Sequence, residues 1–221
     1  MNDRDNGAAR QDLCRFLAAS YYQPGPELAE EKVFDSMLGA ATRIQPELAA
    51  RVRRLGEAFC AEGVENLLVD YTRLFLGPFD AVARPYASVW LNGQKAGMGD
   101  SSMAVLELYR EGGFEMDEGF RELPDHIAAE LEFLYLLIYR ENEARRSGEA
   151  EALKATSGLK QRFLDAELGC WIGPFTAAVK AGAQCGFYRE LAELTDRFVK
   201  MEAGGNQEQK TPALSRARGF L

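Results

Sequence analysis

The sequence predicts an all-α fold, a single helical domain of about nine helices, on three observations. Apolar residues recur every three or four positions along most of the chain, as in Leu13, Phe16 and Leu17, which is the spacing of one face of a helix. Segments that alternate apolar and polar residues, as strands do, are nearly absent. Glycine and proline interrupt the apolar pattern at intervals typical of helix lengths. A chain of 221 residues is long enough to bury one large core.

Four helices are predicted before a long irregular region. A proline-rich segment at 24–26 ends the first helix, Pro46 suits the first turn of the third, and Gly63 separates the third from the fourth. The segment 77–99 contains two prolines and four glycines, so it is predicted to be a loop, and loops of this length often carry function. The four helices are expected at 8–22, 27–38, 46–62 and 64–76.

Five more helices are predicted after this loop. Asp100 or Ser101 is expected to cap the first of them, and Gly112 and Gly113 are expected to end it. The next begins with Pro124 and Asp125, residues that favour the first turn and its positive end. It is apolar nearly all round, which predicts a central place in the core. The five helices are expected at 101–111, 124–146, 149–168, 171–181 and 186–203.

The domain organisation follows from this order of helices. Residues 1–113 are predicted to form an N-terminal helical part that carries the loop 77–99, and residues 114–203 a C-terminal part. The two parts form one domain, or two subdomains joined by a hinge near 111–123. Residues 204–221 are polar and then mildly basic, and they are predicted to form a flexible tail.

Bulk properties narrow the classes of partner. The net charge of −8 argues against nucleic acid and suits a cationic partner, although acidic proteins also gain solubility this way. No apolar run reaches the ~18 residues of a membrane span, and the N-terminus lacks the apolar region of a secretion signal. The protein is therefore expected to be cytoplasmic, with no stable insertion into a membrane.

The cysteine and histidine pattern speaks against bound metal. The four cysteines contain no close pair, and only one histidine is available to assist them. A chain of this length does not need disulfides either, so free and mostly buried thiols are expected. We expect no metal and no cofactor. The cysteines are Cys14, Cys60, Cys170 and Cys185.

Catalysis also finds little support. His126 is the only histidine, and no GxSxG, P-loop or GxGxxG motif is present to complete an active site. At the start of a helix, the pKa of His126 is expected to be lowered by the helix dipole and raised by Asp125 or Glu122. A structural histidine is the simplest interpretation, and no enzymatic activity is expected.

Two segments instead indicate a peptide-binding site. Residues 71–91 read YTRLFLGPFDAVARPYASVWL, and residues 122–127 read ELPDHI. Tyr86 and Trp90 are four residues apart, so a helical turn would place both rings on one face, where aromatic side chains give large contact area. The acidic residues near the second segment could bind an arginine side chain: Asp117, Glu118, Glu122 and Asp125. Two alternatives are that Trp90 only anchors the loop and that the acidic connector is a solvated link.

Together with WIGPF at 171–175 and FYRELAEL at 187–194, these segments resemble the TorD/DmsD/NarJ family of redox-enzyme maturation chaperones. The resemblance extends from about residue 12 to residue 198 and is nearer the TorD/DmsD side. It implies an all-helical cytoplasmic chaperone that binds the twin-arginine leader of a molybdenum-cofactor oxidoreductase, and the enzyme body in some relatives. The chaperone delays export of this enzyme until the cofactor is inserted. The family contains monomers and domain-swapped dimers.

The resemblance also implies the site. The family's Pro-Asp-His motif falls on residues 124–126 and its proline-aromatic-x-Ser-Val motif on residues 85–89, although Tyr86 stands where some relatives have tryptophan. Substitution of Asp125 or His126 by alanine is expected to weaken leader binding and leave the fold intact. Two other functions remain open, an assembly factor that grips a folded subunit without recognising a leader, and a nucleotide-binding protein. The predicted peptide-binding residues are Pro85, Tyr86, Ser88, Trp90, Glu122, Pro124, Asp125 and His126.

Overall fold

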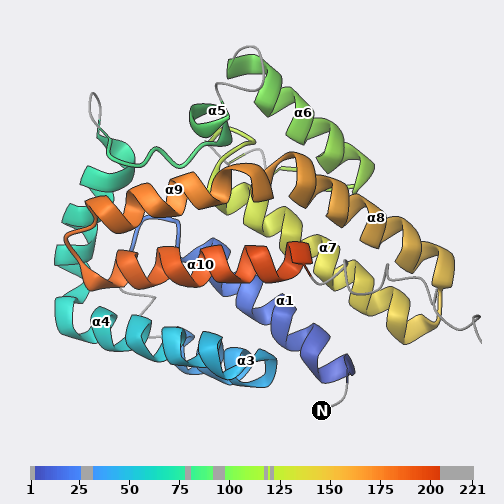
Figure 1. Cartoon of the computed structure of the whole chain (residues 1–221), viewed down its shortest axis with the longest axis horizontal. Coiled ribbons are helices and arrows are strands. Elements are labelled where there is room, and N and C mark those ends of the chain that lie inside the picture. The colour runs from blue at the N-terminus through green and yellow to red at the C-terminus, as the bar shows by residue number, and fades with distance from the viewer. Residues whose placement is uncertain are drawn as a thin grey trace, which may run out of the picture.

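The computed structural model describes residues 3–25, 32–77, 81–91, 98–116, 119 and 122–204. Nine α-helices occupy most of these residues, and no strand occurs among them (Figure 1), so the all-α prediction is confirmed. The helices are α1 (Asp3–Ala19), α3 (Val33–Ile44), α4 (Pro46–Tyr71), α5 (Ala87–Trp90), α6 (Met98–Glu111), α7 (Ile127–Ser147), α8 (Ala150–Ala166), α9 (Leu168–Gly182) and α10 (Gly186–Gly204), and a π-helical turn, η1 (Thr72–Leu76), follows α4.

The boundaries differ from the predictions in several places. The second helix begins at Val33 rather than residue 27, and residues 26–31 lie outside the described part of the chain. The third and fourth predicted helices form one element, α4, that bends where Gly63 adopts φ 72° and ψ 160°. Left-handed φ angles cost glycine little, so the break lies where it was expected. Helix α6 starts at Met98, before either predicted cap, and α9 starts at Leu168, three residues before its predicted start at position 171.

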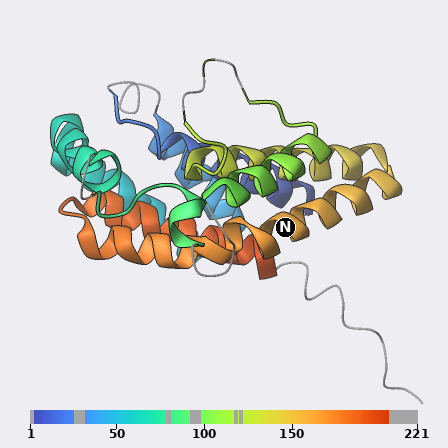
Figure 2. The ribbon, with the colours of Figure 1, turned by 90° about the horizontal axis from the view of Figure 1, so that it is seen from above.

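The helices pack into one continuous core. Helix α1 lies against α7, α10 lies against α4 and α9, and α3 contacts both α1 and α4. Viewed from above, α9 and α10 form one side of the molecule and α1 and α7 the other (Figure 2). Helices from the two predicted parts are thus interleaved, and the division at residue 113 remains a prediction. The predicted tail lies outside the described residues from position 205 onward.

Two carboxylates of α4 hold the start of α10. The buried Asp70 accepts hydrogen bonds from the backbone N–H groups of Gln184 and Cys185, at 2.9 and 2.8 Å. Glu62 accepts hydrogen bonds from the backbone N–H groups of Gly186 and Phe187. Negative groups are favourable at the positive end of a helix, where N–H groups lack partners. These contacts fix the end of α4, from which the predicted functional loop departs.

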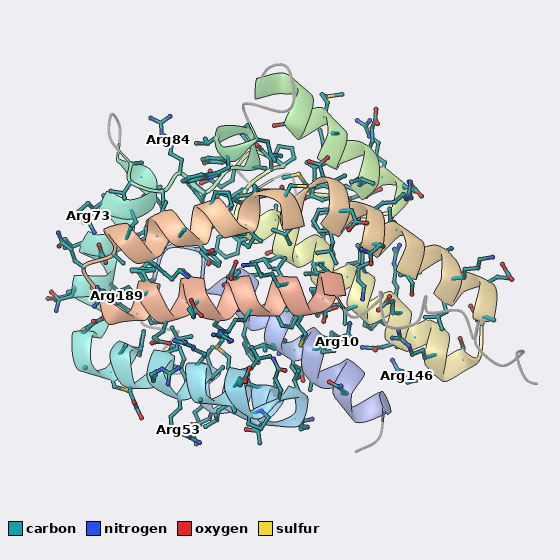
Figure 3. The ribbon with its side chains drawn as sticks, viewed as in Figure 1. Arg10, Arg53, Arg73, Arg84, Arg146 and Arg189 are labelled. Carbon is teal, nitrogen blue, oxygen red and sulfur yellow. The ribbon has the colours of Figure 1, made fainter. Side chains whose placement is uncertain are left out.

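A buried charge network joins four helices, α1, α7, α8 and α10. Lys160 of α8, which is 2% exposed, lies 2.8 Å from a carboxylate oxygen of Glu141 of α7 and 3.2 Å from one of Glu202 of α10. Arg10 of α1 forms a second salt bridge with Glu202, and it extends toward the end of α10 in Figure 3. Buried charges of this kind are tolerated only when they are paired.

The predictions for the cysteines are confirmed only in part. All four cysteines lie among the described residues, and none forms a disulfide. Cys14 and Cys185 are buried, but Cys60 and Cys170 are exposed, so the expectation of mostly buried thiols is wrong for half of them. No helix in the described ranges is long and apolar enough to cross a membrane.

Candidate peptide-binding site

The structure brings the two predicted segments together. The backbone N–H of Ala87 donates a hydrogen bond of 2.9 Å to the carbonyl of Asp125, and the N–H of Ile127 donates one of 2.8 Å to the carbonyl of Pro85. This exchange forms an antiparallel bridge between Tyr86 and His126. Their rings meet edge to face with centroids 5.2 Å apart. The start of α7 and the loop before α5 are therefore one unit.

Asp125 ties this unit together from the inside. Its Oδ2 accepts a hydrogen bond of 2.9 Å from the backbone N–H of Ser88, and its Oδ1 accepts one of 3.0 Å from the hydroxyl of Ser102. The residue is 0% exposed, so this carboxylate cannot reach an arginine of a peptide. The structure makes Asp125 a positioning residue that joins α5, α6 and α7, in place of the predicted direct contact.

His126 is buried as well, with 3% of its surface exposed. It precedes α7 in an extended conformation, and its Nδ1 accepts a hydrogen bond from the N–H of Ala128, which makes it the N-cap. The helix therefore begins at Ile127, three residues after the predicted start at Pro124. Burial lowers the pKa of His126 to about 4, against the opposing charges of Glu122 and Asp125, which raise it. Burial outweighs the two carboxylates, and the imidazole is neutral at pH 7.

This neutral histidine predicts a specific pH dependence. Between pH 6.5 and pH 4, His126 is protonated in the unfolded chain, where its pKa has the ordinary value of 6.5, but not in the folded protein. The stabilisation that depends on neutral His126 is therefore fully present above pH 6.5 and is lost as the pH falls toward 4. Between pH 7 and pH 5 the loss through His126 is about 2 kcal/mol. His126→Asn keeps a capping acceptor but does not titrate. Urea unfolding at both pH values should show a loss smaller by that amount in the variant, and equal losses would contradict the assignment.

Three tyrosines and two carboxylates interact with one another next to this segment. The hydroxyl of Tyr86 donates a hydrogen bond to the carboxylate of Glu122, and the hydroxyl of Tyr22 donates one of 2.6 Å to Glu132 of α7. Burial, and then the charge of Glu122, raises the pKa of Tyr71 to about 12. The pKa values of Tyr22 and Tyr86 are also raised by burial and by these carboxylates. We call Tyr22, Tyr71, Tyr86, Glu122 and Glu132 the acidic tyrosine cluster.

The two carboxylates of the cluster have no cationic partner among the described residues. Neither Glu122 nor Glu132 forms a salt bridge there, and each is only half-buried. Their hydrogen bonds come from tyrosine hydroxyls, whose rings lie beside them. A guanidinium group pairs with carboxylates and stacks on aromatic rings. The acidic tyrosine cluster therefore has the chemistry to bind arginine.

Comparisons with known proteins show which family this chain belongs to. The family model described as nitrate reductase delta subunit matches residues 42–177. The chain belongs to this family. The chaperone protein TorD of Vibrio parahaemolyticus is 29% identical over 76% of this chain and 71% of its own length, and the TorD of Photobacterium profundum is 31% identical over 62% of each chain. A crystal structure of a proposed redox enzyme maturation protein from Archaeoglobus fulgidus shares the fold, with a TM-score of 0.50, 21% identity and coverage of 90% of this chain and 95% of that one.

Trp90 has a different role from Tyr86 in this family member. Its indole N–H donates a hydrogen bond of 2.9 Å to the carbonyl of Arg84, and its ring packs edge to face against Phe175 of α9, 6.1 Å between centroids. Tyr86 lies before α5 in an extended conformation. The two rings therefore do not share a helical face as predicted, and Trp90 anchors α5 on α9, as the alternative interpretation held.

Most of the large apolar side chains exposed in the described part of this family member lie in one stretch of the sequence. Of eight large hydrophobic residues exposed in the described ranges, five lie between positions 76 and 123. This stretch contains the predicted loop, α6 and the approach to α7. Exposed apolar side chains are typical of surfaces that bind a partner when they form one patch. The five are Leu76, Val82, Val89, Met103 and Leu123.

Sequence reasoning found part of this site. It located Tyr86 and Glu122, which belong to the acidic tyrosine cluster, and Pro85, Ser88, Pro124, Asp125 and His126, which support it. It missed Tyr22 and Glu132, which are 110 positions apart and carry no motif that connects them, and it did not single out Tyr71. The predicted acidic residues Asp117 and Glu118 lie outside the described residues.

Proposed function

We propose that this protein is a cytoplasmic, system-specific chaperone of a molybdenum-cofactor oxidoreductase. It binds the twin-arginine leader of that enzyme and delays export until the cofactor is inserted. Membership of the family and relatives named chaperone protein TorD support the chaperone role. The observation that supports leader binding is the acidic tyrosine cluster, with two carboxylates that pair with no cation in the described residues. We expect no catalytic turnover.

Leader binding uses the carboxylates and tyrosine rings of the cluster for the arginines and the exposed apolar residues for the apolar run. An arginine of the leader enters between Glu122 and Glu132 and stacks on the neighbouring tyrosine rings. The hydroxyl of Tyr86, which donates to Glu122 in the free protein, then shares this carboxylate with the guanidinium. The apolar run that follows the arginines lies along the exposed apolar residues between positions 76 and 123. Asp125 and His126 hold the two walls in place without contacting the peptide.

The test is the double substitution Glu122→Gln with Glu132→Gln. It removes both charges and keeps the size and hydrogen-bonding capacity of the side chains, so leader affinity should fall about 10–30-fold, as for loss of a charged pair worth about 1.5–2 kcal/mol. Isothermal calorimetry with a synthetic twin-arginine leader measures this change. The loss should be larger at low ionic strength, because salt screens exposed charges.

A matched control carries the same change in net charge. Glu65 and Glu151 are exposed residues of α4 and α8, and their double replacement by glutamine should leave leader affinity unchanged. Equal losses in the two double variants would show a general effect of acidic charge and contradict the assignment to the cluster. An assembly factor without leader recognition would bind a leaderless enzyme subunit and show no heat with the leader alone.

The oligomeric state remains part of the proposal, as a monomer or a domain-swapped dimer. The proposed hinge at 111–123 is described only in part. In that part, the guanidinium of Arg140 of α7 donates a hydrogen bond to the carbonyl of Gly112. The ring of Phe114 packs against Tyr109 and Phe133, with centroids 4.9 and 5.7 Å away. A swapped dimer would make these same contacts between two copies.

A further inference from the structure

A cavity between α3 and the first half of α4 contains an exposed cysteine. Its volume is about 480 Å³, within the range of roughly 300–1,000 Å³ that small-molecule sites occupy. Apolar side chains of both helices form its floor, and the rings of Phe34 and Phe59 meet there with centroids 4.8 Å apart. We infer that Cys60 forms a mixed disulfide in this cavity with a small zwitterionic thiol of the chemistry of glutathione.

The geometry of α4 leaves the thiol of Cys60 open to this cavity. Side chains of a helix lean toward its N-terminus, over the residues three and four positions earlier. The residue four positions before Cys60 is Gly56, which also lines the cavity and has no side chain to cover that space. An added Cβ at Gly56 would lie 3.3 Å from the Cβ of Phe34, so the glycine also lets α3 approach closely. The thiol therefore lies beside an open space with an apolar wall.

Four exposed charged side chains surround the apolar floor of the cavity. Lys32 and Arg53 are the cations, and Asp35 and Glu57 are the carboxylates. None of the four forms a salt bridge with another described residue, and Arg53 extends outward from α4 in Figure 3. Glutathione carries two carboxylates and one ammonium group at pH 7. These groups can pair with both cations and with one carboxylate of the rim while the sulfur lies at Cys60.

The reaction is a thiol–disulfide exchange with oxidised glutathione. The thiolate of Cys60 attacks one sulfur of the disulfide and forms a bond to it. The other glutathione leaves as a thiolate, which takes up the proton that Cys60 lost. No further oxidant is needed, because one disulfide replaces another. A second thiol can reverse the step, so the modification is a reversible one that depends on the redox state around the protein.

The other cysteines of the chain provide an internal comparison. Cys170 is exposed like Cys60, but it does not line this cavity, and its thiol donates a hydrogen bond of 2.9 Å to the carbonyl of Asp165. Cys14 and Cys185 are buried. If exposure alone decided reactivity, Cys60 and Cys170 would react alike. Recognition by the cavity predicts that Cys60 reacts first.

The test treats the full chain with oxidised glutathione and follows both exposed cysteines by peptide mass spectrometry. Cys60 should be modified faster than Cys170. In Lys32→Gln/Arg53→Gln, the rate at Cys60 should fall about 3–10-fold, as for the loss of two exposed ion pairs with the ligand. The same variant should react with 2-hydroxyethyl disulfide at the rate of the unmodified protein, because this neutral reagent has no carboxylate to pair with the cations.

A matched control is Arg43→Gln with Lys154→Gln, which changes the net charge equally at two exposed positions outside the cavity. It should react with both reagents at the rate of the unmodified protein. Equal slowing in the control would overturn the inference, because it would show a general effect of charge.

Three other outcomes would also overturn the inference. The first is an equal rate at Cys60 and Cys170, and the second is an unchanged rate in Lys32→Gln/Arg53→Gln. The third is equal slowing of that variant with both reagents, because the cations would then act on the thiol and not on the ligand. The cavity shares no residue with the acidic tyrosine cluster, so each of these outcomes leaves the proposed leader binding standing.

Discussion

Replacement of Asp125 by alanine is expected to destabilise the fold by about 3 kcal/mol. The buried carboxylate accepts one hydrogen bond from the backbone of Ser88 and one from the hydroxyl of Ser102. Alanine removes both acceptors, and a buried donor left without a partner costs about 1–3 kcal/mol. Urea or thermal unfolding at pH 7 measures this loss. The result would differ from the expectation based on sequence alone, in which this substitution weakens binding and leaves the fold intact.

The substitution Asp125→Asn separates hydrogen bonding from charge. The amide oxygen can accept from the N–H of Ser88, and the amide nitrogen can donate to the hydroxyl of Ser102, which is able to accept. Asparagine should therefore restore most of the stability and most of the leader affinity. A variant with asparagine that is fully stable but does not bind the leader would contradict the positioning role, because the charge itself would then be required for binding.

The helices of this chain can be predicted because their signals are local. The apolar spacing of α1, α7 and α10 depends on side chains a few positions apart, and Gly63 marks a bend through its own backbone freedom. Pro124 and Asp125 mislead in the same local way, since both favour a first helical turn. The helix nevertheless starts at Ile127, because the carbonyl of Asp125 accepts its hydrogen bond from Ala87, on a segment far away in the sequence.

Which residues of the site are buried and which are exposed could not be predicted from such local signals. Tyr86 and His126 belong to adjoining motifs, yet one is half-buried and the other is closed off from solvent. Which of them reaches the surface depends on how α5 and α6 pack over the start of α7. Tyr22 follows the first helix, and its hydrogen bond to Glu132 arises only because α1 packs along α7. Such pairings are set by tertiary packing and leave no pattern in one sequence.

The second large effect is expected at the buried charge network. Lys160→Met keeps the length of the side chain and removes its charge, so Glu141 and Glu202 lose the cation that they share. Removal of one partner from a buried ion pair typically costs about 3–5 kcal/mol. We expect the lower part of this range, because Arg145 and Arg10 still lie beside the two carboxylates. Chemical unfolding at pH 7 measures the change.

The pH dependence of this loss identifies its cause. Burial raises the pKa of Glu202, but hydrogen bonds and charges from Arg10 and Lys160 lower this pKa by a larger amount. The pKa of Glu202 in the folded protein therefore lies below the ordinary 4.5. The stabilisation from Glu202 is therefore complete at pH 7 and disappears as the pH falls below about 4.5 toward the lowered value. The gap between Lys160→Met and the unmodified protein should narrow over this window. Lys200→Met removes an exposed cation of α10 that pairs with Asp196, and it should change stability by less than about 0.5 kcal/mol. A comparable loss in both variants would show that burial of Lys160 is not the source of its effect.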